Sequence, residues 1–306
     1  MLLDTASLYF RAFFGVPSSM RAPDGFPVNA IRGLLDFISR LVGTHQPTQL
    51  VCCWDDDWRP AWRVELVPTY KLHRLAEPAT NAETVPDELD RQVPVIREAL
   101  AAWGIAVVGA PGCEADDVIG TLATRSTMPV DIVTGDRDLF QLVDDDREVR
   151  ILYTATGGVG RAEVIDDAAV RSRYGIPAAH YADFAAMRGD PSDGLPGVPG
   201  VGDKTAASLI ASRGDLVAIR AAAADPTSGL APTLRRKLLD ASDYLDAAVH
   251  VVAVKRDADL IVPTAGFGIP SEPVDPDMWT ALDERFDLGS SARRLEAVLG
   301  GTTVPD

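Results

Sequence analysis

The pattern of apolar and polar positions along the chain predicts short buried strands that alternate with helices. Apolar runs of strand length lie at residues 2–3, 50–54, 105–108, 130–134 and 149–152. Apolar side chains at helical spacing predict a helix over 29–41, and further helices are expected over 87–103 and 115–124. Because strand and helix alternate, we expect an α/β fold with a central, mostly parallel sheet wrapped by helices.

An acidic residue follows each of the first four predicted strands. Asp4 follows the first strand and Asp55 follows the second, and the next two strands lead to Glu114, Asp116, Asp117, Asp136 and Asp138. In open parallel sheets, ligands bind outside the carboxyl ends of the strands, so these acids are expected at one edge. Gathered carboxylates repel one another and need a compensating cation, for which oxygen-bound Mg²⁺ or Mn²⁺ is the natural choice.

A simpler explanation exists for each acidic stretch taken alone. Acids at the start of a helix offset the helix dipole, and Asp and Gly are ordinary turn residues. These two preferences could explain the acids of 112–117 alone, or those of 135–138 alone, without any metal site. The metal site is favoured because four strands in turn end in the same way.

The segment over 58–86 combines basic residues with four prolines and has no clean period. Its first part, 58–75, contains Arg59, Arg63, Lys71 and Arg74 against the single acid Glu65, a net charge of +3. We expect a mobile segment that becomes helical in part. The alternative is a solvated loop.

A glycine- and proline-rich run over 189–206 opens the second half, and it contains Asp190 and Asp193. A helix is expected to begin near Lys204. Glycines allow a phosphate to approach main-chain N–H groups at a helix N-terminus, as in helix–hairpin–helix modules that hold a nucleic-acid backbone. A surface loop between helices is the alternative.

The remaining residues, 207–306, are rich in alanine and are expected to be mostly helical. They include the basic cluster of residues 235–237, which fits either a DNA contact or a solvated helix face.

Composition narrows the class of protein. The 306 residues, 46% of them hydrophobic, suffice for one large domain with an appendage or for two domains. No apolar run approaches the roughly 18 residues of a membrane span, and no signal peptide precedes the first strand, so a cytoplasmic location is expected. The three cysteines and four histidines are not spaced as zinc or disulfide sites. A net charge of −16 argues against a polyanionic partner, except that bound cations would neutralise the acidic cluster.

Several stretches together resemble one known family. In chain order they are Asp4 with SLYFRAF, Trp54-Asp55, Arg63 with PTYKLHR, PGCEADDVIGTLA, IVTGDRDLFQLV, and MRGDPSDGLPGVPGVGDKTA. They resemble the 5′-nuclease domain of bacterial DNA polymerase I and the stand-alone bacterial and phage flap endonucleases. The closing LDERFDLGSSARRLEAVL is similar to the family's final helix, so the resemblance covers nearly the whole chain. Because no polymerase segment follows, a free-standing nuclease is expected.

The resemblance implies a division into two domains. Residues 1–165 would form a PIN-like, metal-binding α/β nuclease core that includes a helical arch at about 58–93. Residues 166–306 would form a helical DNA-binding domain, with its helix–hairpin–helix motif at about 184–212.

The resemblance also implies the site residues. A first metal site would use Asp4, Asp55, Glu114 and Asp116, and a second would use Asp136, Asp138, Asp190 and Asp193, with Asp117 between them or in an outer shell. Lys71 and Arg74 match arch residues that grip the scissile phosphate, and Arg63 matches a nearby phosphate contact. The hairpin residues that would hold DNA are Gly197, Gly200, Gly202, Lys204 and Thr205, and in this family the hairpin turn holds a potassium ion.

The implied activity is that of a structure-specific 5′-flap endonuclease and 5′-3′ exonuclease, which hydrolyses phosphodiester bonds by two-metal-ion catalysis. The implied role is removal of flaps and RNA primers in replication and repair. The expected partners are DNA with 5′ flaps, nicks or gaps and RNA–DNA hybrids, bound by a monomer at the bacterial nucleoid and not at a membrane.

The chain departs from the family pattern around the acids. Thr5 follows the first acid where the family has glycine, and Gly194 follows the last acid where asparagine is usual. His73 lies between the two arch residues in place of a smaller or polar residue. These departures leave the expected metal ligands intact and concern the residues that surround them.

Three other protein classes share part of the pattern. A haloacid-dehalogenase-type phosphatase has paired aspartates like Asp136 and Asp138, but places them after its first strand. A PIN-type ribonuclease shares the acidic sheet edge but is much shorter and lacks the glycine-rich hairpin. A non-catalytic DNA-binding scaffold would have lost acids of the site, and none is missing here.

Overall fold

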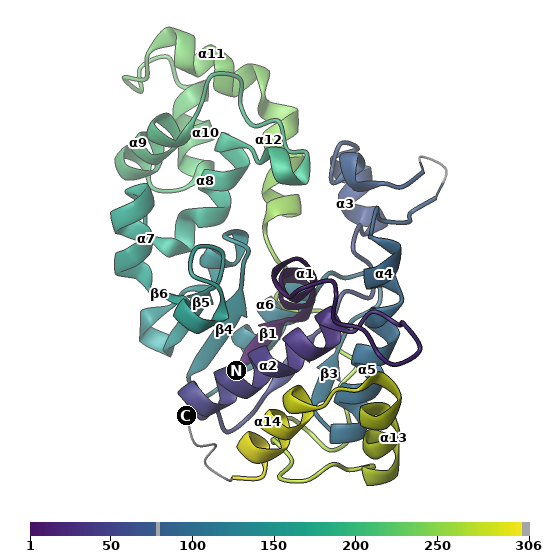
Figure 1. Ribbon diagram of the computed structural model, residues 1–306. Helices are drawn as coiled ribbons and strands as arrows, with labels where there is room; N and C mark the ends of the chain where they lie inside the picture. The colour runs from purple at the N-terminus through teal and green to yellow at the C-terminus, as the bar shows by residue number, and fades with distance from the viewer. Residues whose placement is uncertain (78–79, 302–306) are drawn as a thin grey trace.

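A six-stranded sheet forms the centre of the structure, a computed structural model that describes residues 1–77 and 80–301 (Figure 1). The strands are β1 (Leu2–Asp4), β2 (Val51–Cys53), β3 (Ala106–Val108), β4 (Val130–Thr134), β5 (Val149–Tyr153) and β6 (Glu163–Ile165). Their order is β3-β2-β1-β4-β5-β6, and only β6 runs antiparallel to its neighbour. The predicted mostly parallel sheet is therefore confirmed. The sequence analysis missed β6, because two of its three residues are exposed and show no apolar run.

Both faces of the sheet are buried, as parallel sheets require. Successive side chains of a strand point to opposite faces, so Leu2 and Val51 belong to one apolar cluster, while Leu3 and Cys52 belong to the other. Helices α1 (Thr5–Gly15), α2 (Asn29–His45) and α5 (Gln92–Trp103) contribute to the cluster of Leu3. Helix α6 (Ala115–Arg125) covers the face of Leu2.

The last two helices return to the sheet. Helix α13 (Pro276–Phe286) contacts α5, where the Trp279 and Trp103 rings lie edge to face at 5.2 Å, and α14 (Ser290–Leu299) contacts α2 (Figure 1). We predicted a helical DNA-binding domain over 166–306, so the placement of α13 and α14 differs from that division. Its reason is the amphipathic face of α14, which buries Ala292 and Leu295 in the cluster of Leu3.

The helices between β6 and α13 form a helical part that shares the apolar cluster of Leu2 with the sheet (Figure 1). They are α7 (Asp167–Tyr174), α8 (Tyr181–Arg188), α9 (Asp203–Arg213), α10 (Leu216–Ala224), α11 (Pro232–Asp240) and α12 (Ser242–Val252). Helix α8 contacts both α9 and α12 and so lies at the centre of this helical part. Within the described ranges 1–77 and 80–301, no helix combines the length and apolarity needed to cross a bilayer.

Two predicted helices are each interrupted. The helix expected over 87–103 is divided into α4 (Asp87–Asp90) and α5, with Pro94 in the first turn of α5. Proline is tolerated there because the first N–H groups of a helix have no partner within it. The closing helix expected over 282–299 is divided at Asp287, whose φ of 49° is left-handed and ends α13.

Candidate active site

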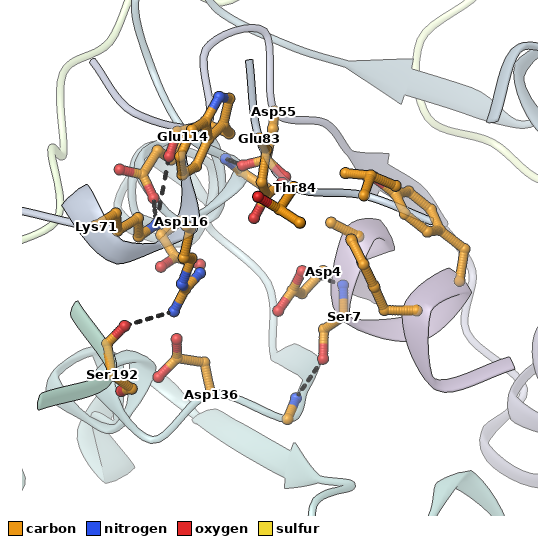
Figure 2. Close-up of a pocket in the computed structure, with 18 of the residues that line it drawn as sticks. Asp4, Ser7, Asp55, Lys71, Glu83, Thr84, Glu114, Asp116, Asp136 and Ser192 are labelled. Carbon is orange, nitrogen blue, oxygen red and sulfur yellow. Dashed lines mark hydrogen bonds and ion pairs between the residues drawn. The ribbon is translucent and has the colours of Figure 1, made fainter. Parts of the chain in front are cut away.

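A cavity of about 1660 Å³ opens at the carboxyl edge of the sheet. Eight of the predicted metal ligands line it, namely Asp4, Asp55, Glu114, Asp116, Asp136, Asp138, Asp190 and Asp193. Figure 2 shows Asp4, Asp55, Asp116 and Asp136 around one opening, with Lys71 beside Glu114. Strands β1, β2, β3 and β4 carry the first six acids to this edge, and the loop after α8 carries the last two.

Main-chain N–H groups and a neighbouring hydroxyl hold several of these carboxylates in place. Asp4 caps α1 by accepting from the N–H of Ser7 at 3.1 Å, and its other oxygen accepts from the Thr134 hydroxyl at 2.7 Å. Asp55 accepts from the N–H of Ala115 at 2.8 Å, which joins the end of β2 to the start of α6. The acids are therefore fixed by the strand ends themselves.

The cavity carries an excess of buried negative charge. Burial, followed by repulsion from neighbouring carboxylates, raises the pKa of Asp4 and of Asp55 to about 6. The same two causes hold the pKa of Asp116 and of Asp138 well above its usual value. One buried oxygen of Asp138, Oδ1, has no hydrogen-bond partner among the described residues. A cation bound in this cavity would reduce the repulsion among the carboxylates and would give Asp138 Oδ1 a partner.

The donor set fits hard divalent cations, which prefer carboxylate oxygens. In the described part of the chain, no three acidic, histidine or cysteine side chains form a group that would hold an ion unaided. This spacing does not exclude Mg²⁺, because that ion keeps several water ligands and binds through one or two carboxylates. The eight acids of the cavity are the residues that could supply those carboxylates.

Basic side chains already neutralise three of the acids. Lys71 pairs with Glu114, and Arg74 contacts Asp193 at 3.1 Å. Burial alone would lower the pKa of Lys71, but Glu114 raises it, so the lysine is charged.

Asp190 is the third acid with a basic partner. Arg137 contacts it at 2.7 Å and Arg188 at 3.2 Å. Burial opposes ionisation of Asp190, but hydrogen bonds from Ser192 and Arg137 prevail and lower its pKa. The sequence analysis did not identify Arg137, although its position between Asp136 and Asp138 was a usable signal.

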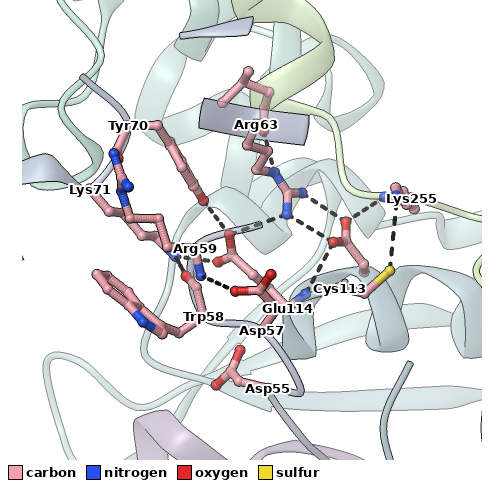
Figure 3. A network of polar contacts seen from close by, with 12 residues as sticks. Asp55, Asp57, Trp58, Arg59, Arg63, Tyr70, Lys71, Cys113, Glu114 and Lys255 are labelled. Carbon is pink, nitrogen blue, oxygen red and sulfur yellow. Dashed lines mark hydrogen bonds and ion pairs between the residues drawn. The ribbon is translucent and has the colours of Figure 1, made fainter. Parts of the chain in front are cut away.

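Arg63 and Asp117 do not line the cavity. Figure 3 shows Arg63 beside Glu114. The guanidinium of Arg63 donates to both Asp117 oxygens, at 2.8 and 2.7 Å, and to Glu114 at 3.2 Å. The oxygens of Asp117 also accept from the N–H groups of Lys255 and Glu114. Arg63 is 2% exposed and Asp117 is 0% exposed. Neither side chain lines the cavity, so the phosphate contact expected of Arg63 stays a prediction, and Asp117 lies one step behind Glu114, as its outer-shell alternative describes.

The buried pair instead positions Glu114. Arg63 and the Tyr70 hydroxyl, at 2.7 Å, both donate to its Oε1, while Lys71 pairs with Oε2. Arg63 also donates through Nε to the Val251 carbonyl at 3.1 Å, which joins this site to α12. Tyr70 was not identified from the sequence, because its role depends on a partner 44 residues away.

The arch segment, residues 58–93, is held by several contacts in its described part, while the mobility expected over 58–86 stays a prediction. It contains α3 (Ala61–Leu66), η1 (Leu72–Arg74) and α4. Arg59 donates through Nε to the Tyr70 carbonyl at 2.6 Å, and Leu75 pairs with Glu83 in an isolated bridge. Residues 78–79, which include one of the prolines behind that expectation, lie outside the described residues.

The hairpin residues Gly197, Gly200, Gly202, Lys204 and Thr205 do not line the cavity. They precede or begin α9 in the helical part, where Lys204 is exposed. Lys237, from the basic cluster of 235–237, donates to the Gly200 carbonyl at 3.3 Å. The predicted hairpin and catalytic residues are thus two separate groups.

Aromatic residues of α1 form another part of the cavity wall. Tyr9, Phe10 and Phe14 of this helix line the cavity. Phe14 is 72% exposed. An exposed aromatic ring at the mouth of an acidic cavity suits stacking against a base.

Family models match most of the chain. The model described as 5′-3′ exonuclease, N-terminal resolvase-like domain, matches residues 1–175, and the 5′-3′ exonuclease, C-terminal SAM fold, matches residues 176–273.

Curated relatives match over the full length. The chain is 59% identical to a 5′-3′ exonuclease of Streptomyces coelicolor, covering 98% of this chain and 99% of that one. It is 52% identical to a 5′-3′ exonuclease of Mycobacterium tuberculosis, covering 98% and 97%.

Solved structures share the fold at low identity. The zinc-bound T5 5′-exonuclease has a TM-score of 0.63 at 17% identity, covering 98% of this chain and 97% of that one. Flap endonuclease-1 from Methanococcus jannaschii has a TM-score of 0.59 at 16% identity, covering 99% and 93%.

Replacing Asp116 by asparagine should stabilise the metal-free protein above neutral pH by about 1–3 kcal/mol, because it removes a buried and repelled charge. Folding raises the pKa of Asp116. As the pH rises above about 4, the ordinary pKa of an aspartate, the unfolded chain loses this proton more readily than the folded protein, and the free energy of unfolding falls. The gain should therefore vanish near pH 4. Chemical denaturation in a chelator at pH 4 and pH 8 measures it.

Asp259→Asn is the control, because Asp259 is exposed in a loop and should give no pH-dependent gain. A metal-free Asp116→Asn variant no more stable than the parent at pH 8 would contradict the crowding of charge in the cavity.

Proposed function

Because this chain belongs to the 5′-3′ exonuclease family, we propose that it hydrolyses phosphodiester bonds of DNA in the acidic cavity. The reaction would be that of a structure-specific 5′-flap endonuclease and 5′-3′ exonuclease. The observation that carries the proposal is the gathering of eight carboxylates in one cavity that Lys71 and Arg74 also line. A phosphate of a DNA strand needs positive charge around it. Metal ions held by the carboxylates would supply part of that charge, and Lys71 and Arg74 would supply the rest.

The carboxylates would hold two or more divalent ions, Mg²⁺ or Mn²⁺. The proposed first set is Asp4, Asp55, Glu114 and Asp116, and the proposed second set is Asp136, Asp138, Asp190 and Asp193. When bound, such ions supply an ionised water as nucleophile and neutralise charge on the attacking and leaving oxygens. The T5 5′-exonuclease, which shares the fold, carries divalent zinc in its solved structure, and this supports the proposal.

Lys71 and Arg74 would act on the reacting phosphate. Both line the cavity, and both are charge-paired with acids of the proposed metal sites. A cation bound at those acids would take over their neutralisation and free the two basic side chains for the phosphate. Fixed positive groups at the place where charge develops in the transition state are a large source of rate enhancement.

The helical part would hold duplex DNA by its backbone. The glycine-rich turn before α9 presents main-chain N–H groups beside exposed Lys204, and the turn's carbonyls would take a potassium ion. A DNA complex of the T5 flap endonuclease has the same fold, which supports this reading. The substrates would be 5′ flaps, nicks, gaps and RNA–DNA hybrids, processed by a monomer during replication and repair.

A fluorescent duplex with a 5′ flap, incubated with Mg²⁺ or Mn²⁺, tests the function directly. We expect cleavage near the flap junction, and we expect Asp136→Asn to abolish it while flap binding persists, because an amide is a poorer ligand for a hard cation. Asp131→Asn is the matched control, since Asp131 lies on the same strand, β4, away from the cavity. Near-normal cleavage by Asp136→Asn in Mg²⁺ would rule out its proposed role.

Truncation of either arch cation should slow the chemical step. Lys71→Ala or Arg74→Ala should lower the single-turnover rate at saturating DNA by roughly ten- to a thousand-fold, the scale of one charged contact to a transition state. Binding to a duplex without a flap should barely change. Arg285→Ala, which removes an exposed charge on α13, is the control. Wild-type rates in both arch variants would assign these residues no catalytic part.

Lys204→Ala should weaken DNA binding and reduce its salt dependence by about one counterion, because the hairpin is proposed to contact phosphates. Single-turnover cleavage at saturating DNA should change much less. Titration of a labelled duplex at several salt concentrations measures the slope. Arg171→Ala removes an exposed charge elsewhere in the helical part and controls for overall charge. An unchanged slope for Lys204→Ala would show that Lys204 does not touch phosphate.

A further inference from the structure

The arch segment and the helical part meet at a backbone contact beside the cavity. Residues 69–74 of the arch segment lie against the acidic loop, which we define as residues 190–195. The Lys71 N–H donates to the Asp193 carbonyl at 2.9 Å, and Lys71 itself has a left-handed φ of 48°. The Arg74 guanidinium donates to the Ser192 carbonyl at 2.9 Å. Main-chain groups therefore account for much of this contact.

Gly194 is what allows the two backbones to come this close. A Cβ atom placed on Gly194 would overlap the Thr69 carbonyl oxygen, at 3.0 Å from the carbonyl carbon, and would lie 3.4 Å from the Lys71 nitrogen. The atoms it would meet belong to the backbone, so they cannot move aside as a flexible side chain would. This is the position where the sequence departs from the family's usual asparagine.

The contact also sets where the two arch cations lie. Residues 69–71 are held on their other side by Arg59, which donates to the carbonyls of Tyr70 and Pro68 at 2.6 and 3.3 Å. Held between Arg59 and the acidic loop, the backbone directs Lys71 to Glu114 and Arg74 to Asp193. Both charges are therefore inside the cavity in the free protein.

We propose that Gly194 positions Lys71 and Arg74 for the reaction, by docking residues 69–74 onto the acidic loop before DNA binds. The catalytic meaning of this docking rests on the proposed function, but the docking itself does not. A preformed arrangement spares the cost of ordering these side chains when the substrate arrives. A side chain at 194 separates the two backbones and releases the arch segment.

A glycine is also favoured at 194 by its φ of 71°, so backbone strain must be separated from docking. The chain contains a close match in Gly175, the C-cap of α7. Its φ and ψ are 72° and 19°, against 71° and 21° for Gly194. The nearest described atom to a Cβ on Gly175 is the Ala207 Cβ at 4.0 Å. Gly175→Ala thus carries the same backbone strain without the clash.

Hydrogen exchange of the metal-free and DNA-free protein tests the docking. We expect the Lys71 amide to exchange slowly in the wild type, because it donates to Asp193. Gly194→Ala and Gly194→Asn should each speed exchange over residues 69–77 by about ten-fold or more. Asparagine tolerates a positive φ better than alanine, so its effect would come from the clash. Gly175→Ala should change exchange near α7 alone.

The same variants can be compared in single-turnover cleavage of the flap duplex at saturating DNA. Gly194→Asn should reduce the rate at least ten-fold with little change in duplex affinity, whereas Gly175→Ala should leave the rate near wild type.

Two results would overturn the proposal. One is a wild-type Lys71 amide that exchanges as fast as an unstructured peptide, and this needs no variant to fold. The other is exchange over 69–77 in both Gly194 variants that matches Gly175→Ala. Exchange requires no cleavage, so these results judge the docking even if the chain proves inactive on flaps.

Discussion

The repulsion among eight carboxylates at one edge of the sheet is the constraint on which the rest of the structure depends. Strand ends bring six of these acids together with two from the loop after α8, and burial holds the pKa of most of them above its usual value. Basic side chains around the cavity neutralise part of this negative charge. Lys71 and Arg74 reach in from the arch segment, and Arg137 and Arg188 neutralise Asp190. In this structure, basic side chains of the chain itself supply part of the positive charge that these carboxylates need.

The acids and their strands could be predicted because their signals are local. An apolar run followed by an acid is visible in the sequence, and the geometry of parallel sheets then gathers those acids. Asp117 could not be separated from Asp116 in this way, because adjacent residues of a helix point in different directions and only the tertiary partner decides their use. That partner is Arg63, 54 residues earlier. The hydrogen bonds of Arg63 to Asp117 and Glu114 likewise have no signal in the sequence.

The contacts of the arch segment were also beyond the sequence. Prolines without a helical period predict mobility over 58–86, but they do not predict which groups this segment contacts. The acceptors of the contacts that hold residues 69–74 are backbone carbonyls, which every sequence possesses, and the donors are the Lys71 N–H and two arginine side chains. A single glycine such as Gly194 forms no sequence pattern. Its role can be inferred only from the structure, where the Thr69 carbonyl occupies the space that a side chain would need.

The return of α14 to α2 has a consequence for how the chain is made. Arg294 pairs with Asp36 across 258 residues, and Leu295 covers a core begun by residues near the start. During synthesis, the part of α2 that packs against α14 therefore stays uncovered until residues 290–299 have left the ribosome, although α1 and α5 can cover other parts earlier. Contacts this distant in sequence make folding slow and leave partly formed cores open to aggregation. The helical part lies between α2 and α14 in the sequence, so all its residues are translated before α14 can pack against α2.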